Sequence, residues 1–392
     1  MTALLLAALY TSTMQVEGVA VSDGVLWAAT AGGVERYDLA TGVRTRLFTT
    51  ADGLPENHVR AVRHDGSLHV RTRLAECVLA ESFRCTAAAQ LPPPAPAAAP
   101  SYRGARETAR LRARGHLIVG TVSGLWLDGR RITPEGQICG NHVAALAAFE
   151  GATWVGTFDA GLCALQGGRF RTVAAPFRMV NDLHVTPQGL WVASAEGLYF
   201  TADGRRFRRE NRLRERGANR IAASSRWLYV TTPFALYALR LDRRDVVRRW
   251  QRPAGSTSLQ AVAVSGDDVW LASEDAGVIR LRGGRFEAFD RASGLPSSWA
   301  VDVAPAAEGG VWVATLRDGA LRLDGHGNLA ERAEPSRWGL RLYRDRGRVL
   351  FGTQQGLAGA ALPDPHVHAL LRTAAGLWVG TEGGLALLDA TS

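Results

Sequence analysis

The chain has 392 residues, of which 46% are apolar and 43 are glycine, so it can bury a large core and is rich in tight turns. No apolar run reaches the roughly 18 residues that a membrane helix needs, and no membrane span is predicted. The net charge is +9, and all 46 basic residues are arginine. A GC-rich genome explains that bias, and selection for bidentate binding of phosphate or carboxylate is the alternative.

A repeat of about 39 residues runs along the whole chain. Its anchor is an apolar or aromatic residue followed three positions later by Thr or Ser, best seen at Trp378 and Thr381. The anchors are Trp27, His69, Ile118, Trp154, Trp191, Tyr229, Trp270, Trp312, Leu350 and Trp378. The segments around them are short and alternate or stay apolar for four to eight residues, which predicts strands rather than helices. This pattern is typical of propeller blades.

We therefore predict an all-β fold, a single closed β-propeller of about ten blades over residues 1–392, with eight or nine blades as alternatives. The C-terminal repeat ends one strand short, and residues 3–11 resemble an outer strand. Residues 1–12 are therefore predicted to complete the last blade and close the ring, which removes an exposed sheet edge. The alternative for this apolar start is the remnant of a secretion signal. The ninth repeat is short and contains Pro363 and Pro365, which predicts a three-stranded blade.

One segment joins an outer strand to the next inner one and carries a family resemblance. It is Asp52-Gly53-Leu54-Pro55 followed by Asn57 and Val59, and a second copy begins at Ser293. Together with the Leu-Trp-Val-Gly-Thr strand, it resembles the two-component regulator propeller repeat, which is best known from sensor regions of bacterial hybrid histidine kinases. The resemblance implies a sensory or scaffolding propeller, and it implies no shared catalytic residue.

The cysteines show no metal spacing, but two pairs are predicted to lie close enough for disulfides. Cys77 and Cys85 flank a hairpin, whereas Cys139 and Cys163 belong to one blade. Such pairs favour a periplasmic or other extracytoplasmic location over the cytoplasm, and four reduced thiols are the alternative. Residues 91–105 are Pro/Ala-rich and are predicted to be an inserted loop within the ring.

Candidate ligand-binding residues stand where inner strands begin, because these positions face the mouth of the central channel. They are His58, Arg106, His142, Trp299, Trp338 and His366, with His368 two residues further along its strand. Histidines on blades two, four and ten would lie far apart on a ten-bladed ring, so no metal and no cofactor are predicted. The alternative is that Asn-His-Val is simply the turn of the repeat.

The sequence favours a non-catalytic sensory or scaffolding propeller that binds a ligand or protein partner at the channel mouth. A signalling protein or an anionic glycan is the candidate partner. The competing class is an enzyme, a lyase or hydrolase acting on a glycan in the channel; three or more converging acidic or His residues would favour it. A third class binds nucleic acid or another polyanion through thirteen arginines on the outer strands of blades five and six, for which protection of the sheet edge is the simpler explanation.

Overall fold

The computed structural model describes residues 6–88, 100–243, 247–253, 256–333, 338–357, 360, 362 and 364–389. Within them the chain forms 39 strands and one short 3-10 helix (Thr50–Asp52). None of the described segments is a helix long and apolar enough to cross a membrane. The strands assemble into ten antiparallel sheets, one for each sequence repeat. The fold is therefore all-β and consistent with propeller architecture, as predicted.

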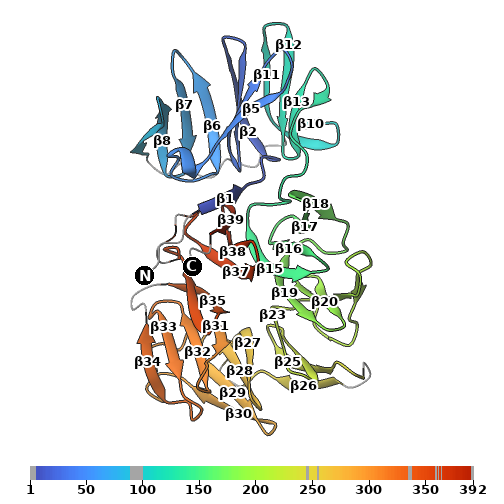
Figure 1. The fold of residues 1–392 in the computed structure, drawn as a ribbon, viewed down its shortest axis with the longest axis vertical. Coiled ribbons are helices and arrows are strands. Elements are labelled where there is room, and N and C mark those ends of the chain that lie inside the picture. Colours follow the sequence, from blue (N-terminus) through green and yellow to red (C-terminus); the bar gives the residue numbers. More distant parts are fainter. Residues whose placement is uncertain are drawn as a thin grey trace.

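Seven sheets make up the body that we call the ring (Figure 1). Their strands are β15 (Val143–Phe149), β16 (Ala152–Thr157), β17 (Gly161–Gln166) and β18 (Arg169–Val173); β19 (Val180–Thr186), β20 (Gly189–Ser194), β21 (Gly197–Thr201) and β22 (Arg208–Arg209); β23 (Arg220–Ala223), β24 (Trp227–Thr231), β25 (Ala235–Arg240) and β26 (Val247–Gln251); β27 (Leu259–Ser265), β28 (Asp268–Ser273), β29 (Val278–Arg282) and β30 (Arg285–Phe289); β31 (Ala300–Pro305), β32 (Val311–Thr315), β33 (Ala320–Leu323) and β34 (Leu329–Ala333); β35 (Gly339–Asp345) and β36 (Arg348–Thr353); and β37 (Val367–Thr373), β38 (Gly376–Thr381) and β39 (Gly384–Leu388) with β1 (Leu6–Tyr10).

The other three sheets form a separate body that we call the three-blade unit (Figure 1). Its strands are β2 (Val16–Ser22), β3 (Val25–Thr30), β4 (Gly33–Asp38) and β5 (Arg44–Phe48); β6 (Val59–His64), β7 (Leu68–Thr72), β8 (Ala75–Leu79) and β9 (Phe83–Ala87); and β10 (Ser101–Tyr102), β11 (Ala105–Ala113), β12 (His116–Thr121), β13 (Gly124–Leu127) and β14 (Arg130–Arg131). The chain enters the ring through β1, builds the three-blade unit and returns to the ring at β15.

Each blade has a first strand in chain order, and contacts between these first strands define the order of the blades. In the ring β15, β19, β23, β27, β31, β35 and β37 contact one another in that order, and β37 also contacts β15. In the three-blade unit β2 contacts both β6 and β11. Nine apolar clusters match these nine junctions: one joins β38 to β15 through Trp378 and Val143, and another joins β12 to β2 through Ile118 and Val16.

The prediction of one ring of ten blades is therefore wrong, although ten sheets do form. The physical reason is that the third blade packs on the first and the tenth packs on the fourth. The predicted N-terminal strand is present, since β1 pairs antiparallel with β39 and places Tyr10 opposite Leu385; residues 1–5 of the predicted clasp lie outside the described part. Within the described residues the ninth sheet has two strands rather than the predicted three.

The Pro/Ala-rich segment was only partly predicted correctly. Its residues 91–99 lie outside the described part, whereas the end of the predicted loop, Ser101–Tyr102 and Ala105, belongs to β10 and β11. Both predicted disulfides are present, Cys77–Cys85 and Cys139–Cys163.

The recurring geometry of the blades comes from the anchor and the hydroxyl that follows it. Trp27, Trp154, Trp191, Trp270 and Trp378 are buried between neighbouring blades. After four of these tryptophans, the Thr or Ser three residues on donates a hydrogen bond that closes the turn between the second and third strands; Thr381 Oγ1, for example, donates to the carbonyl of Gly384 at 3.0 Å. The exception is Ser273, whose hydroxyl bonds to Ser256 and Asp275. The role predicted for these hydroxyls is thus observed.

Candidate functional site

The site lies on the face of the ring where the first strands begin, which we call the mouth face. Because the first two strands of a sheet are antiparallel, the start of the first strand and the turn after the second share this face. His142 and His366 directly precede β15 and β37, whereas Glu382 lies in the turn between β38 and β39. These two blades are neighbours in the ring.

A β-bulge near the start of the first strand sets which side chains enter the channel. The pairing of first and second strands shifts by one residue there in nine of the ten sheets. The residues that the shift skips include Ala144, Asn181, Gln260, Val301 and His368, and these five line one cavity of about 330 Å³ at the channel entrance. Bulges re-aim side chains in this way.

Three of the predicted site histidines converge beside that cavity. The rings of His142 and His368 lie 5.0 Å apart, and Phe158 packs against His142 at 5.1 Å. His368 Nε2 is 3.1 Å from Glu382 Oε1, and His366 Nδ1 is 2.7 Å from Asp364 Oδ1. The prediction that these histidines would be far apart is wrong, because the ring closes between β37 and β15.

Electrostatics differ across this cluster. The hydrogen bond from His368 is the main cause that lowers the pKa of Glu382 to about 2, and the neighbouring histidine charges add to it. Burial lowers the pKa of His142, and the charge of His368 lowers it further. At neutral pH the cluster therefore holds a carboxylate beside a neutral, half-buried imidazole, which is the form in which imidazole binds metals.

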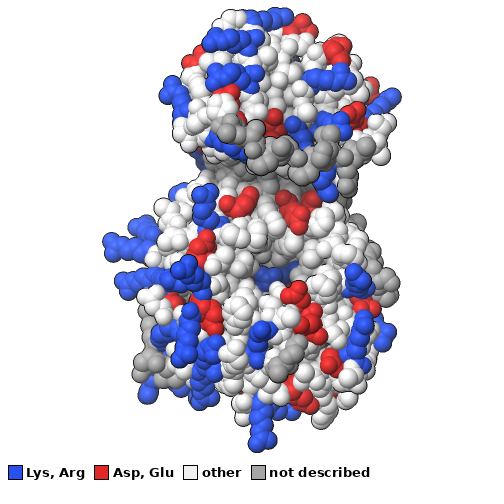
Figure 2. Space-filling model, turned by 180° about the vertical axis from the view of Figure 1, so that it is seen from behind, with Lys and Arg blue, Asp and Glu red and all other residues white. Residues whose placement is uncertain are grey.

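A cleft of about 670 Å³ separates the three-blade unit from the ring. The ring contributes His142, His366 and Glu382, and the three-blade unit contributes His58 and Arg73 among others. Figure 2 shows acidic side chains gathered where the two bodies meet. It also shows a hollow at the centre of the ring, with basic side chains inside it.

Two equivalent asparagines hold the cleft together. The Asn141 side chain accepts from the Ser12 amide at 2.6 Å and donates to the Ser12 and Ala31 carbonyls. Asn57, in the matching position of the three-blade unit, donates to the Gly383 carbonyl of the ring at 3.2 Å. The Asn-His pair of the repeat thus serves both as the contact between units and as part of the cleft wall.

The remaining predicted residues are divided between the two bodies. His58 lies in the cleft, where its Nε2 is 3.3 Å from Glu17 Oε1. This hydrogen bond is the main cause that lowers the pKa of Glu17. Arg106 is exposed on β11, and its charge lowers the Glu17 pKa slightly. Trp299 and Trp338 lie on the ring, where Arg317 stacks over Trp338 at 5.7 Å.

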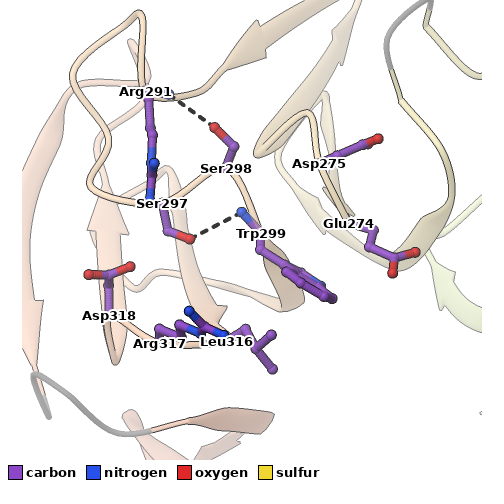
Figure 3. A pocket seen from close by; sticks show the side chains of 9 residues that line it. All are labelled: Glu274, Asp275, Arg291, Ser297, Ser298, Trp299, Leu316, Arg317 and Asp318. Carbon is purple, nitrogen blue, oxygen red and sulfur yellow. Dashed lines mark hydrogen bonds between the residues drawn. The ribbon is translucent and has the colours of Figure 1, made fainter.

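Figure 3 shows the pocket beside Trp299, which measures about 360 Å³. The indole lies between the turn that carries Glu274 and Asp275 and the turn that carries Arg317 and Asp318. An aromatic face flanked by both charge signs suits a polar, partly apolar ligand.

Exposed aromatic side chains mark the mouth face. Among the described residues four aromatic side chains are exposed, namely Phe158, Phe234, Trp299 and Trp338. Each stands either before a first strand or in the turn after a second strand of the ring, so all four share the mouth face.

The predicted arginine rim is partly engaged in local contacts. Arg249 pairs with Glu215 at 2.8 Å, and Arg248 stacks over Trp227 at 4.9 Å. Figure 2 shows basic side chains projecting from one flank of the ring. Arg244 lies outside the described residues.

Sequence reasoning missed several residues of the site. Glu382 and Asp364 complete the histidine cluster, and Asn181, Asn219 and Arg220 line the channel entrance. The available signal was positional: Glu382 directly follows the Thr of the clearest repeat, in a turn that must share the mouth face.

No protein-family model and no curated protein matches the chain. The fold is similar to the extracellular domain of a protein described as hybrid two-component system BT4673 from B. thetaiotaomicron, with 11% identity and a TM-score of 0.53 over 96% of this chain and 70% of that one. It is also similar to the BT3049 extracellular domain of the same organism, with 14% identity and a TM-score of 0.57 over 94% of this chain and 61% of that domain. The fold is also similar to that of streptogramin B lyase, with 14% identity and a TM-score of 0.54 over 64% of this chain and 94% of the lyase chain. The resemblance to sensor propellers thus extends to the fold.

Proposed function

We propose that the chain is a non-catalytic sensory or scaffolding propeller that binds a soluble ligand at the mouth face of the ring. The observation that carries the proposal is the gathering of all four exposed aromatic side chains of the described residues on that face. Large exposed apolar groups beside cavities mark binding sites in soluble proteins. The likeness of fold to extracellular sensor domains is consistent with this role.

The ligand class we favour is an oligosaccharide with acidic groups. Trp299 and Trp338 offer flat apolar surfaces, and Arg317 supplies a cation beside both. The two tryptophans directly precede β31 and β35, which neighbour each other and lead to β37 with its histidines. A ligand of several units could follow this arc of blades. We also propose an extracytoplasmic location, because both cysteine pairs form disulfides.

The test is an array of neutral and acidic oligosaccharides probed with the wild-type chain and with the W299A/W338A variant. We expect the wild type to bind a subset and the double variant to bind at least about tenfold more weakly, which corresponds to about 1.4 kcal/mol. The matched control is V185A, because Val185 is similarly exposed and lies at the far end of its sheet from the mouth. Equal binding by wild type and double variant, or no binding of any probe, would refute this ligand class.

A glycan lyase or hydrolase is the second candidate, and the convergence of His142, His368 and Glu382 favours it. A neutral imidazole beside a carboxylate can act as a general base. Mass spectrometry of any bound oligosaccharide after prolonged incubation would decide between the two roles. New fragments with the wild type but not with H368A would support catalysis, and an unchanged oligosaccharide would support binding alone.

A further inference from the structure

We propose that His142, His368 and Glu382 form a binding site for a divalent transition-metal ion of the Zn²⁺ type at the mouth of the ring. One ligand atom from each residue lies within 4.8 Å of the others. His368 and Glu382 are already 3.1 Å apart. An ion with bonds of about 2.1 Å holds tetrahedral ligands roughly 3.4 Å apart, so a small movement of His142 toward the pair completes the site.

The state of His142 is the second observation. Its ring packs between Phe158 and His368, and within the described residues neither ring nitrogen forms a hydrogen bond to the protein. Neither nitrogen is among the fully buried atoms, and the residue lines both the channel cavity and the cleft, so an ion can reach it. A metal ion between His142 and His368 would give a ring nitrogen of His142 a partner.

Rigid backbone holds the three ligands. His142 directly precedes β15, and its carbonyl accepts from the Phe158 amide at 3.0 Å. His368 occupies the bulge of β37. Glu382 follows Thr381, whose hydroxyl closes the turn. All three ligands lie at strand ends, in a bulge or in a tight turn whose backbone is fixed by hydrogen bonds, and such positions keep their geometry better than long loops do.

The ligand set selects the class of metal. Two imidazoles and one carboxylate suit Zn²⁺ and neighbouring transition metals, whereas Ca²⁺ and Mg²⁺ prefer oxygen ligands. Three protein ligands leave one position open. Asp364 and His366, 2.7 Å apart, form a second group that shares Glu382. They can orient the ligands of the first group from outside the metal's own coordination sphere.

This inference deepens the proposed function, because the site lies between the channel cavity and the cleft, both of which His142 lines. An open coordination position there would take an anionic or hydroxyl oxygen of the ligand. The metal would thus fix the acidic end of an oligosaccharide while the aromatic side chains bind its rings.

The experiment measures metal alone. The full chain, without a histidine tag and after treatment with a chelator, is titrated with ZnCl₂ by calorimetry, and retained metal is quantified by mass spectrometry. Because no described cysteine is free, thiolates do not compete. We expect about one ion per chain. Loss of an outer partner of a ligand typically weakens binding about 10- to 100-fold, so removal of a direct ligand in H142A or H368A should weaken it by at least that factor. E382Q is a milder variant that preserves shape.

The matched control is H116A. His116 pairs with Asp128 at 2.6 Å in the three-blade unit, and among the described residues no third metal-binding group joins them. Melting temperature in chelator checks that each variant folds. The inference is overturned if no Zn²⁺ is retained, if H142A, H368A and E382Q all bind as the wild type does, or if H116A weakens binding equally. The metal titration contains no oligosaccharide, so absence of Zn²⁺ binding would not contradict oligosaccharide binding on the array. Absence of oligosaccharide binding on the array would likewise not contradict Zn²⁺ binding.

Discussion

A single methyl group can test how the ring closes. Gly380 on β38 packs against Val143 on β15, and a Cβ placed on Gly380 would lie 2.4 Å from Val143 Cγ1 and 3.0 Å from its Cβ. Atoms do not approach that closely, so the blades must separate or Val143 must move. Overpacking of this kind costs about 1–3 kcal/mol, and G380A should lower the free energy of unfolding by that amount.

Removing the obstructing side chain should recover part of the loss. Val143 is fully buried, so V143A alone should cost about 1.6 kcal/mol for two methyl groups, plus a cavity term. In G380A/V143A the new methyl occupies that space, and the coupling free energy should be about 1–2 kcal/mol. Urea unfolding followed by tryptophan fluorescence provides the four free energies, with unchanged m-values as the condition for comparison.

The matched control uses the same residue types at another junction. Gly120 faces Val16 in a similarly tight contact, because an added Cβ would lie 2.6 Å from Val16 Cγ1. G120A should therefore couple to V16A, and G380A combined with V16A should be additive within about 0.5 kcal/mol. Coupling of G380A to V16A instead of V143A would refute the seven-bladed ring and restore a single ring of ten.

Three further predictions concern the clasp, the cleft and a buried carboxyl. Y10A should cost about 2–3 kcal/mol in urea unfolding, because Tyr10 packs against Phe170 and Trp378 at 5.3 and 5.8 Å; a loss below about 0.5 kcal/mol would show that the clasp is dispensable. N141A removes three hydrogen bonds, one to Ala31 of the three-blade unit and two to Ser12 of the segment that joins the units, each worth about 1 kcal/mol. Hydrogen exchange at Ser12 and Thr13 should therefore accelerate, and unchanged exchange would contradict this role. Burial raises the pKa of Glu35 despite its hydrogen bonds to Arg44, Thr13 and Tyr37, so the folded state prefers the protonated acid. The contribution of Glu35 to the free energy of unfolding therefore falls as pH rises through the raised pKa. The stability of E35Q relative to wild type should therefore increase with pH above the ordinary glutamate pKa of 4.5. The opposite slope in urea unfolding would show that Arg44 keeps Glu35 charged.

Much of the site was predictable residue by residue, but its assembly was not. Strand starts follow from the repeat, and this placed His142, His366 and Trp299 on one face. The distance between His142 and His368 does not follow from the repeat, because it depends on which blades are neighbours. The bulge that turns His368 into the channel entrance is also invisible in the alternation of apolar residues. Glu382 was missed because turn carboxylates are usually solvated.

The sequence by itself determined the blade. The spacing of anchor and hydroxyl, the short apolar strands and the apolar N-terminal segment specify ten similar sheets and the strand that completes the last one. These are local properties, since hydrogen bonds within a sheet and closure of its turns involve residues close in sequence.

The tertiary structure decided the order of the blades. Gly120 and Gly380 occupy equivalent positions, and so do Val16 and Val143, so either glycine fits either valine and the sequence pattern favours no pairing. Only the packed structure shows that Gly120 meets Val16 and Gly380 meets Val143. That choice separates seven blades from three, opens the cleft between them, and brings the histidines of β15 and β37 together.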